Sequence, residues 1–294
     1  GRSGARVIIM ESNNGLGGQL RGEVEVLNGS SSMEWVKSVS EELKGLDNVT
    51  ILTRTTAFGY YDSNVINAIE SISDHLLIPA PYQVRQRLWQ VRAKKVLIAA
   101  GATERPLVFA NNDRPGIMLA SAARRYVNQF AVKPGNRAVI FANNDDGYKT
   151  ALNISQKGIE VQAVIDSRSN ACSEWISKVK DIGIECICGT AVVNTHGYLG
   201  LTGVDIAPLS VDGKSINGAL RFLSADLLAI SGGWSPNVHL HCHAGGRPKY
   251  DPQIEAFIPG ERKQEEYSIG AANGSFNLSS CLADGYNTGL LLAS

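Results

Sequence analysis

An apolar run, an acid and a glycine pair follow one another near the start of the chain. Residues 4–20 are GARVIIMESNNGLGGQL: Val7–Met10 is apolar, Glu11 follows it, and Gly17 and Gly18 come shortly after. This order is typical of the second strand of a dinucleotide-binding α/β unit, where an acid at the strand end takes the hydroxyls of an adenosine ribose. The alternative is an acid that only faces water.

The glycine loop that holds the pyrophosphate should lie roughly 20 residues before such an acid. Only three residues precede Gly4. A later glycine, Gly101, again follows an apolar strand-like run, and the missing side chain of such a glycine lets the backbone approach a ligand. We therefore expect Glu11, Gly18 and Gly101 to belong to one cofactor site.

Strand-like and helix-like segments alternate along the whole chain, which predicts an α/β fold. Strands are expected over 48–62 and within 85–106, and helices over 30–46 and, opened by a proline, over 114–130. A second strand–turn–helix–strand unit starts at Asn136. The apolar run 225–233 then leads back to the first unit. The predicted domains are therefore 1–132 for the truncated first domain, 133–224 for an inserted second domain, and 225–294 for the return to the first.

The turn of the second unit has lost most of a phosphate-binding fingerprint. Aligned with G-x-G-x-x-G, the turn ANNDDG has Ala142 and Asn144 where two glycines belong, and only Gly147 is kept. Asp145 and Asp146 stand where the pyrophosphate would lie. A carboxylate about 5 Å from a phosphate charge repels it by roughly 3 kcal/mol at an effective dielectric constant near 20. We predict that this unit keeps the fold and binds no nucleotide.

Other polar clusters receive structural interpretations. His239, His241 and His243 alternate, so on a strand they would share a face as a metal site, but structural or interface roles are favoured and no metal is expected. The arginines of the RQR and ARR clusters are interpreted as solvated; these are Arg85, Arg87, Arg124 and Arg125. The five cysteines contain no C-x-x-C and are interpreted as small buried apolar residues.

Composition excludes several functions. Lys plus Arg equals Asp plus Glu, at 28 each, so no bulk charge would attract nucleic acid or an anionic membrane. No apolar run approaches the length of a membrane span, and the N-terminus has no signal-peptide core, so a cytoplasmic location is expected. Hydrolase and kinase motifs are absent.

Four longer motifs resemble the α subunit of heterotetrameric sarcosine oxidase. They are LTRTTAFGYYD (52–62), RQRLWQVRAKKVLIAAGATERPLVFANNDRPGIMLASA (85–122), LLAISGGWSPNVHLH (227–241) and GAANGSFNLSSCLADG (270–285). The wider superfamily is that of pyridine nucleotide–disulfide oxidoreductases. The resemblance thus implies an α/β fold of two nested Rossmann-like domains of the glutathione-reductase type, the first without its initial strand and glycine loop.

The resemblance also implies cofactors, partners and an activity. In this family the α subunit holds NAD where relatives hold FAD, an FMN lies between α and β, and the amine-oxidising FAD belongs to β. The complex, with its β, γ and δ subunits, oxidises sarcosine with folate and oxygen to glycine, methylene-folate and hydrogen peroxide. Catalytic residues are thus expected in the partner subunit and none in this chain. FAD-binding relatives have Gly-Asp in the C-terminal motif, and Gly270-Ala271 here suits NAD, which has no ribityl chain.

The family's cofactor residues map onto ten positions of this sequence when the glycines are included. Around the adenosine ribose lie Glu11, Ser12 and Asn13, with Gln19 just past Gly18 and with Ala57 against the adenine. Flanking the nicotinamide half are Ala271, Phe276 and Leu278, while Gly101 lies at the second glycine turn.

Members of this family have flanking domains that this sequence lacks. They begin with a ferredoxin-like domain and the phosphate loop, and they end with a folate domain. We therefore expect the chain to be a central fragment of a longer subunit, weak in NAD binding by itself; a natural short protein is the alternative. An FAD-dependent NAD(P)H oxidoreductase and a non-catalytic scaffold are the rival functions. Sarcosine or a related secondary amine fits as substrate, and NAD fits as a redox-active or a structural ligand.

Overall fold

The computed structural model describes residues 1–293, which form two compact units. Unit 1 comprises Gly1–Gly18, Val26–Thr103 and the chain from Ser235 onwards. Unit 2 comprises Gln19–Glu25 and Glu104–Trp234. The nested order expected from the sequence is therefore present, with one unit inserted into the other. Within the described residues, every helix is too short or too polar to cross a membrane.

The divisions between the units differ from the sequence-based boundaries. Residues 132/133 and 224/225 both fall inside unit 2. The reason is that Ile117–Leu119 and Leu227–Ser231, which the sequence analysis placed in the first domain, are parallel neighbours in the sheet of unit 2. Three elements lie across the divisions: η1 (Gly18–Gly22), β9 (Ala102–Glu104) and β18 (Trp234–Pro236).

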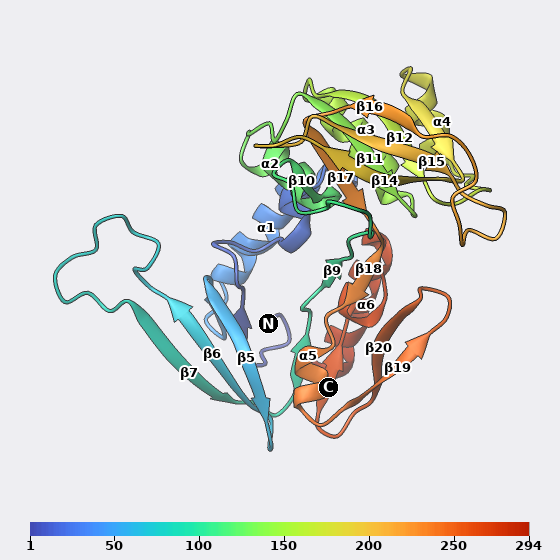
Figure 1. The fold of residues 1–294 in the computed structure, drawn as a ribbon. Helices are drawn as coiled ribbons and strands as arrows, with labels where there is room; N and C mark the ends of the chain where they lie inside the picture. The colour runs from blue at the N-terminus through green and yellow to red at the C-terminus, as the bar shows by residue number, and fades with distance from the viewer. Residues whose placement is uncertain (294) are drawn as a thin grey trace. The chain divides into compact units, whose positions relative to one another are not determined.

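Unit 1 contains short parallel and antiparallel strand pairs, a three-stranded antiparallel sheet and helices of one to several turns (Figure 1). In its N-terminal part lie β1 (Val7–Met10), β2 (Val26–Leu27), β3 (Ser30–Ser31), α1 (Ser32–Lys44), β4 (Val49–Leu52), β5 (Thr55–Tyr61), β6 (Val65–Ser71), β7 (Gln86–Arg92) and β8 (Val96–Ile98). In its C-terminal part lie α5 (His239–His243), β19 (Arg247–Asp251), β20 (Ala256–Glu261), β21 (Glu266–Ser268), η2 (Gly270–Asn273) and α6 (Leu278–Ala293).

Two of these strand pairs are parallel, β1 with β4 and β8 with β21. Within residues 1–293, no strand pairs with the second edge of β1 or of β8. A small core that includes Tyr60, Ile66 and Ile98 joins the two pairs, since Met10 of β1 and Val96 of β8 both pack against it. The predicted cofactor residues Glu11 and Gly101 thus follow the carboxyl ends of parallel strands in one unit.

Unit 2 is a three-layer α/β domain built on a parallel sheet of order β10-β17-β11-β12-β13. Its elements are β10 (Ile117–Leu119), α2 (Ala120–Gln129), β11 (Arg137–Ala142), α3 (Asp146–Gln156), β12 (Glu160–Asp166), α4 (Glu174–Asp181), β13 (Glu185–Cys188), β14 (Thr190–His196), β15 (Gly203–Pro208), β16 (Arg221–Ser224) and β17 (Leu227–Ser231). Because side chains alternate along a strand, Ala138 and Ile140 of β11 pack in the core with α2, α3 and α4. Val139 and Phe141 pack in the opposite core with β14, β15 and β16.

The structure corrects two predictions of secondary structure. The segment 48–62 forms two strands, β4 and β5, separated at Arg54, which has a left-handed backbone (φ +50°). The helix expected over 114–130 begins only at Ala120, and residues 117–119 form β10. The proline correctly signals that a helix is near. It does not reveal that residues 117–119, just before the helix, pair with a strand 110 residues later in the chain.

Candidate functional site

The first part of the candidate site is the turn after β1. Glu11 is partly buried, and its Oε1 accepts hydrogen bonds from the backbone N and the Nδ2 of Asn13, both at 2.8 Å. The exposed Ser12 hydroxyl lies 3.4 Å from the same oxygen. Oε2 of Glu11 is left without a hydrogen-bond partner in residues 1–293. A half-exposed carboxylate with one open oxygen fits a pair of ribose hydroxyls.

Backbone hydrogen bonds hold this turn in place. The Glu11 N donates to Leu52 O, and Thr55 N donates to Glu11 O. Arg54 N donates to Asn13 O, at 2.8 Å. The parallel register of β1 with β4 therefore continues into the turn and fixes the acid at the carboxyl end of the strand, where ligands of open α/β sheets bind.

Two of the predicted glycines adopt left-handed backbone conformations. Gly18 has φ +51° and Gly101 has φ +72°, and a Cβ at either position would have open space around it. Both conformations are strained for other residues. The open space fits a close-lying ligand, so the residues present are compatible with a bound dinucleotide.

The remaining predicted residues lie at three places. Ala57 on β5 is partly buried and packs against the same core of unit 1 as Met10. Ala271 is in η2, and the half-exposed Phe276 precedes α6, which starts at Leu278. Gln19 lies in the segment Gln19–Glu25 that belongs to unit 2. The structure thus brings Glu11, Ser12 and Asn13 into hydrogen-bond contact and groups Ala271 with the start of α6.

The η2 turn is tied to α6 by its own hydrogen bonds. The Gly270 N donates to Oδ2 of Asp284 at 2.7 Å, and Ser275 N donates to Gly270 O. Asp284 lies on α6, so an acid from the helix stabilises the turn before Ala271. No signal short of the fold itself could assign this role to Asp284, since it lies 14 residues away.

Unit 2 has its own strand-end acid, which the sequence analysis missed. Asp166 ends β12, the parallel strand that follows α3, and Glu11 follows β1 of unit 1 in a similar way. Asp166 is fully buried and accepts hydrogen bonds from Tyr148 Oη (2.9 Å), from Arg168 N (2.9 Å) and from Arg168 Nη2 (2.8 Å). Its distance of about 20 residues from the strand–helix turn of Ala142 was a usable signal.

Arg168 bridges two acids of this unit. Its Nη2 also lies 2.8 Å from Oδ1 of Asp145. Burial acts to lower the pKa of Arg168, but hydrogen bonds to Asp166 and Asp145 raise it above the ordinary arginine value. Burial, with the negative charge of Asp166, raises the pKa of the Tyr148 phenol. Asp166, at the strand end where a ribose-binding acid would stand, thus already has its carboxylate oxygens hydrogen-bonded within the protein.

A backbone N–H group at the start of α3 is likewise hydrogen-bonded within unit 2. Asn144 Oδ1 accepts a hydrogen bond from Asp146 N at 2.9 Å, so one of the free N–H groups at this helix start is capped. Asn144 Nδ2 donates to Ser231 O at the end of β17, at 2.9 Å. The Cβ of a residue larger than Gly147 would meet the Ala142 Cβ at 2.4 Å, so this glycine serves close packing of helix on strand.

The carboxylates of Asp145 and Asp146 both have partners within unit 2. Asp146 lies 3.7 Å from both Arg124 Nη2 and Lys149 Nζ, and it accepts a 2.7 Å hydrogen bond from Trp234 Nε1. Their charges are therefore partly offset. Repulsion alone therefore does not describe this turn, because a capping bond and ion pairs hold its side chains within unit 2.

The interpretation of Arg124 as a solvated side chain is wrong. It is 2% exposed rather than solvated, and its Nη2 lies 3.1 Å from Glu23 Oε1. Burial raises the pKa of Glu23 to about 7, against the lowering effect of Arg124. Position 124 is on the inner face of α2, beside Ala123 and Val127, which places the arginine in the interior. Arg85, Arg87 and Arg125 are exposed, as expected.

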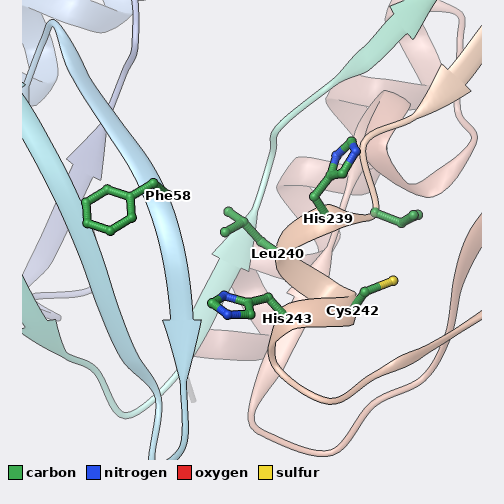
Figure 2. A pocket seen from close by; sticks show the side chains of 6 residues that line it. Phe58, His239, Leu240, Cys242 and His243 are labelled. Atoms are coloured by element: carbon green, nitrogen blue, oxygen red, sulfur yellow. The ribbon is translucent and has the colours of Figure 1, made fainter.

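The alternating histidines lie on the short helix α5 rather than on a strand. The buried His241 Nδ1 is 2.5 Å from Oε1 of the buried Glu266. His243 Nδ1 accepts a hydrogen bond from Tyr60 N at 2.9 Å, and Figure 2 shows His243 and Leu240 on the side of α5 toward β5. The three rings therefore have separate environments. In the described part of the chain, no cluster of His, Cys, Asp or Glu is arranged to hold a metal ion.

The cysteine interpretation is wrong for at least two positions. Cys172 and Cys242 are exposed, and the other three are only partly buried. Cys172 lies in the loop before α4, and Cys242 lines an open hollow of about 530 Å³ beside α5 (Figure 2). A second hollow of about 260 Å³ is lined by His241, Glu266 and neighbouring residues. Neither hollow is lined by any of the ten predicted cofactor residues.

Comparison with solved structures defines the fold class. A T. acidophilum thioredoxin reductase matches with a TM-score of 0.74 and 18% identity over 99% of this chain and 91% of its own. L-proline dehydrogenase from P. horikoshii matches with a TM-score of 0.67 and 18% identity, over 97% of this chain and 50% of its own. The chain therefore has the nested two-domain α/β fold of these oxidoreductases, as expected.

Sequence comparison is more specific. The sarcosine oxidase α subunit of Corynebacterium sp. (strain U-96) is 39% identical over 297 residues, 100% of this chain and 30% of the relative. That of Rhizobium meliloti (strain 1021) is 37% identical over 286 residues, 97% of this chain and 28% of the relative. No protein-family model matches. Over its whole length the chain is homologous to one segment of the sarcosine oxidase α subunits, which confirms the resemblance seen in its motifs.

Proposed function

We propose that this chain is the dinucleotide-binding segment of a subunit in a sarcosine-oxidase-like complex, and that it holds NAD in unit 1. The observation that carries the proposal is the match of the whole chain to sarcosine oxidase α subunits at 37–39% identity. The chain spans about 30% of the length of these relatives, so the activity of the whole complex is part of the proposal.

In unit 1 the Glu11 carboxylate would accept the ribose hydroxyls through its open Oε2. The 2.8 Å bonds from Asn13 orient this carboxylate, and Ser12 lies on its exposed side. Gly18 and Gly101 leave room for a close approach of the ligand. Ala57 would face the adenine, Gln19 would lie beyond the glycine pair, and the Ala271–Leu278 turn would flank the nicotinamide half.

Unit 2 would remain free of nucleotide. Support comes from Asp166, whose oxygens are taken by Arg168 and Tyr148, and from Asn144, which caps the start of α3. A ligand would have to break these bonds before its own could form. The same features, and the lack of a C-x-x-C, weigh against an FAD-dependent NAD(P)H oxidoreductase, in which both units bind nucleotides.

The proposed complex oxidises sarcosine with tetrahydrofolate and O2 to glycine, methylene-tetrahydrofolate and hydrogen peroxide. Its flavins, an FAD in the β subunit and an FMN between α and β, would supply the redox chemistry. No residue of this chain is assigned to bond-making, and γ and δ subunits complete the heterotetramer. A cytoplasmic location belongs to the same proposal.

Mass spectrometry of the ligands released from the purified full-length complex tests this function. The proposal predicts NAD in addition to the flavins, and loss of NAD alone from the Glu11→Ala complex. FAD with no NAD would favour the reductase alternative. The absence of every nucleotide from the α-type subunit would favour a non-catalytic scaffold.

A further inference from the structure

The turn that joins β21 to α6 (residues 269–277, the β21–α6 turn) follows the carboxyl end of a parallel strand, as the turn after β1 does. Ile269 N donates to Ile98 O at 3.0 Å, so the register of β21 with β8 continues to the start of this turn. Ligands of open α/β sheets bind at such strand ends. The proposed function places the nicotinamide half of NAD here, beside Ala271.

The turn is short, and its own backbone bonds are those of a 3-10 helix. Gly274 N donates to Ala271 O at 3.2 Å, and Ser275 N donates to Gly270 O at 3.1 Å. Hydrogen bonds in a 3-10 helix have poorer geometry than those in an α-helix, and the helix is stable only in short pieces. The position of Ala271 therefore depends on contacts that reach the turn from outside.

On the side of α6, close packing supplies little of this support. None of the residues of α6, Leu278–Ala293, is buried. Asn273 of the turn, with Asp284 and Thr288 of α6, lines the second hollow, of about 260 Å³. Close-packed side chains resist displacement, whereas a hollow does not. On this side, polar contacts rather than packing hold the turn.

Asp284, in the second turn of α6, makes the strongest of these polar contacts. Its Oδ2 accepts a 2.7 Å hydrogen bond from Gly270 N, and a bond to a carboxylate is roughly twice as strong as a neutral one. This bond fixes the peptide unit that enters the turn one residue before Ala271. Cys281, on the same helix, donates from Sγ to Ser275 O at 2.9 Å. Both ends of the turn are thus tied to α6, and the carboxylate holds the end next to Ala271.

We infer that Asp284 is a positioning residue for the nicotinamide half of NAD: by holding Gly270, its carboxylate sets the place of Ala271 against the ligand. This inference rests on the proposed function, which puts NAD in unit 1. It deepens that function by assigning the two halves of the site to different acids. Glu11 would bind the adenosine ribose directly, whereas Asp284 acts on the other half through the backbone of the turn.

Titration of the nucleotide-free full-length protein with two ligands tests the inference. The ligands are NAD and ADP-ribose, which lacks the nicotinamide. Asp284→Ala should weaken NAD binding by roughly fivefold or more, the equivalent of one hydrogen bond, and leave the affinity for ADP-ribose unchanged. Asp284→Asn keeps an acceptor oxygen and should restore most of the NAD affinity. The matched control is Asn287→Ala, at an exposed polar residue of the same helix, which should bind both ligands like wild type.

Hydrogen exchange without ligand gives the second measurement. In Asp284→Ala the amides of residues 270–275 should exchange faster than in wild type, while those of β19 and β20 stay unchanged. Faster exchange throughout unit 1, or unchanged exchange in the turn, would overturn the inference.

Three results of the titration would also overturn it: equal weakening of NAD and ADP-ribose, no weakening of NAD in Asp284→Ala, or no rescue by Asp284→Asn. These results presuppose that the wild type binds both ligands, and they leave the proposed function intact. A wild-type protein that binds neither ligand would refute the proposed function itself, and the inference with it.

Discussion

Glu11 and Asp166 occupy equivalent places in the two units but have opposite environments. Each acid stands at the carboxyl end of a parallel strand of its unit, β1 for Glu11 and β12 for Asp166. Glu11 is partly exposed and uses one carboxylate oxygen for contacts with its own turn. Asp166 is fully buried, and its oxygens accept bonds from Arg168 and Tyr148.

A strand-end acid can take ribose hydroxyls only when its hydrogen-bonding capacity is free, and of these two acids Glu11 keeps one carboxylate oxygen open. In unit 2 the sequence retains the strand, the acid and one glycine, yet Asp166 and the Asp146 N–H already have partners inside the unit. A buried, paired network of this kind stabilises the fold and resists opening.

The largest expected effect is on the stability of unit 2, and it follows from breaking the hydrogen bonds that join Asp166 to Arg168 and Tyr148. Arg168→Leu leaves the Asp166 carboxylate buried without its charge partner, which costs about 3–5 kcal/mol. Hydrogen exchange of the β11 and β12 amides in the full-length protein measures this loss as a lower opening free energy. The control is Arg221→Leu, which removes an ion pair between two half-exposed side chains, Arg221 and Glu185, and should cost less than about 1 kcal/mol. Equal effects of the two variants would contradict the assigned role of Arg168.

Glu23 gives unit 2 a distinct pH dependence. Its pKa is raised from 4.5 to about 7, so between these values the folded protein holds a proton that the unfolded chain releases. The stability contributed by Glu23 is therefore full below pH 4.5 and falls by about 3 kcal/mol as the pH rises to 7. Urea unfolding of wild type and Glu23→Gln across this range isolates the effect, since the variant lacks it. Parallel pH profiles for the two proteins would refute it.

In unit 1 the corresponding test concerns binding rather than stability. Glu11→Ala removes the proposed acceptor of the ribose hydroxyls, and a charge-assisted hydrogen bond contributes about 1.5–3 kcal/mol. Titration of the full-length variant should show roughly ten- to a hundredfold weaker NAD binding. Glu41→Ala, on the exposed face of α1, serves as the control and should bind like wild type. Unchanged NAD affinity of the Glu11→Ala variant would show that the ribose does not bind at this turn.

The smallest expected effect is at the start of α3. Asn144→Ala uncaps the Asp146 N–H and removes the bond to Ser231 O, at a cost of about 1–2 kcal/mol, whereas Ala at the exposed Asn170 costs almost nothing. Uncapping should still not create a nucleotide site, because Asp166 stays paired with Arg168. Saturable NADH binding that maps to the 142–147 turn, in wild type or in this variant, would contradict the description of unit 2.

The sequence predicts the strands that carry the two acids because their signals are local. Apolar runs end at Met10 and near Asp166, and β-type residues with flanking turns mark both strands. Residues whose roles depend on contacts far along the chain are predicted poorly. Arg124 was interpreted as solvated, since the pattern of a single helix does not reveal that Glu23 lies against it.

The same physical reason explains the errors in the organisation of unit 2. Residues 117–119 form a strand because β17 pairs with them across more than 100 residues of chain. The capping of Asp146 by Asn144 was equally invisible in a turn that local rules classify only as a degraded glycine loop. Asp166 was the exception, because its spacing from Ala142 could have identified it.

The number of NAD molecules released per chain of the purified full-length complex tests the central claim most directly. The comparison of the two units predicts one NAD per chain in the wild type, none retained after gel filtration of Glu11→Ala, and one retained by Arg168→Leu that still folds. Two NAD molecules per chain, or one that Glu11→Ala keeps and Arg168→Leu loses, would show that unit 2 holds the cofactor and would contradict the account.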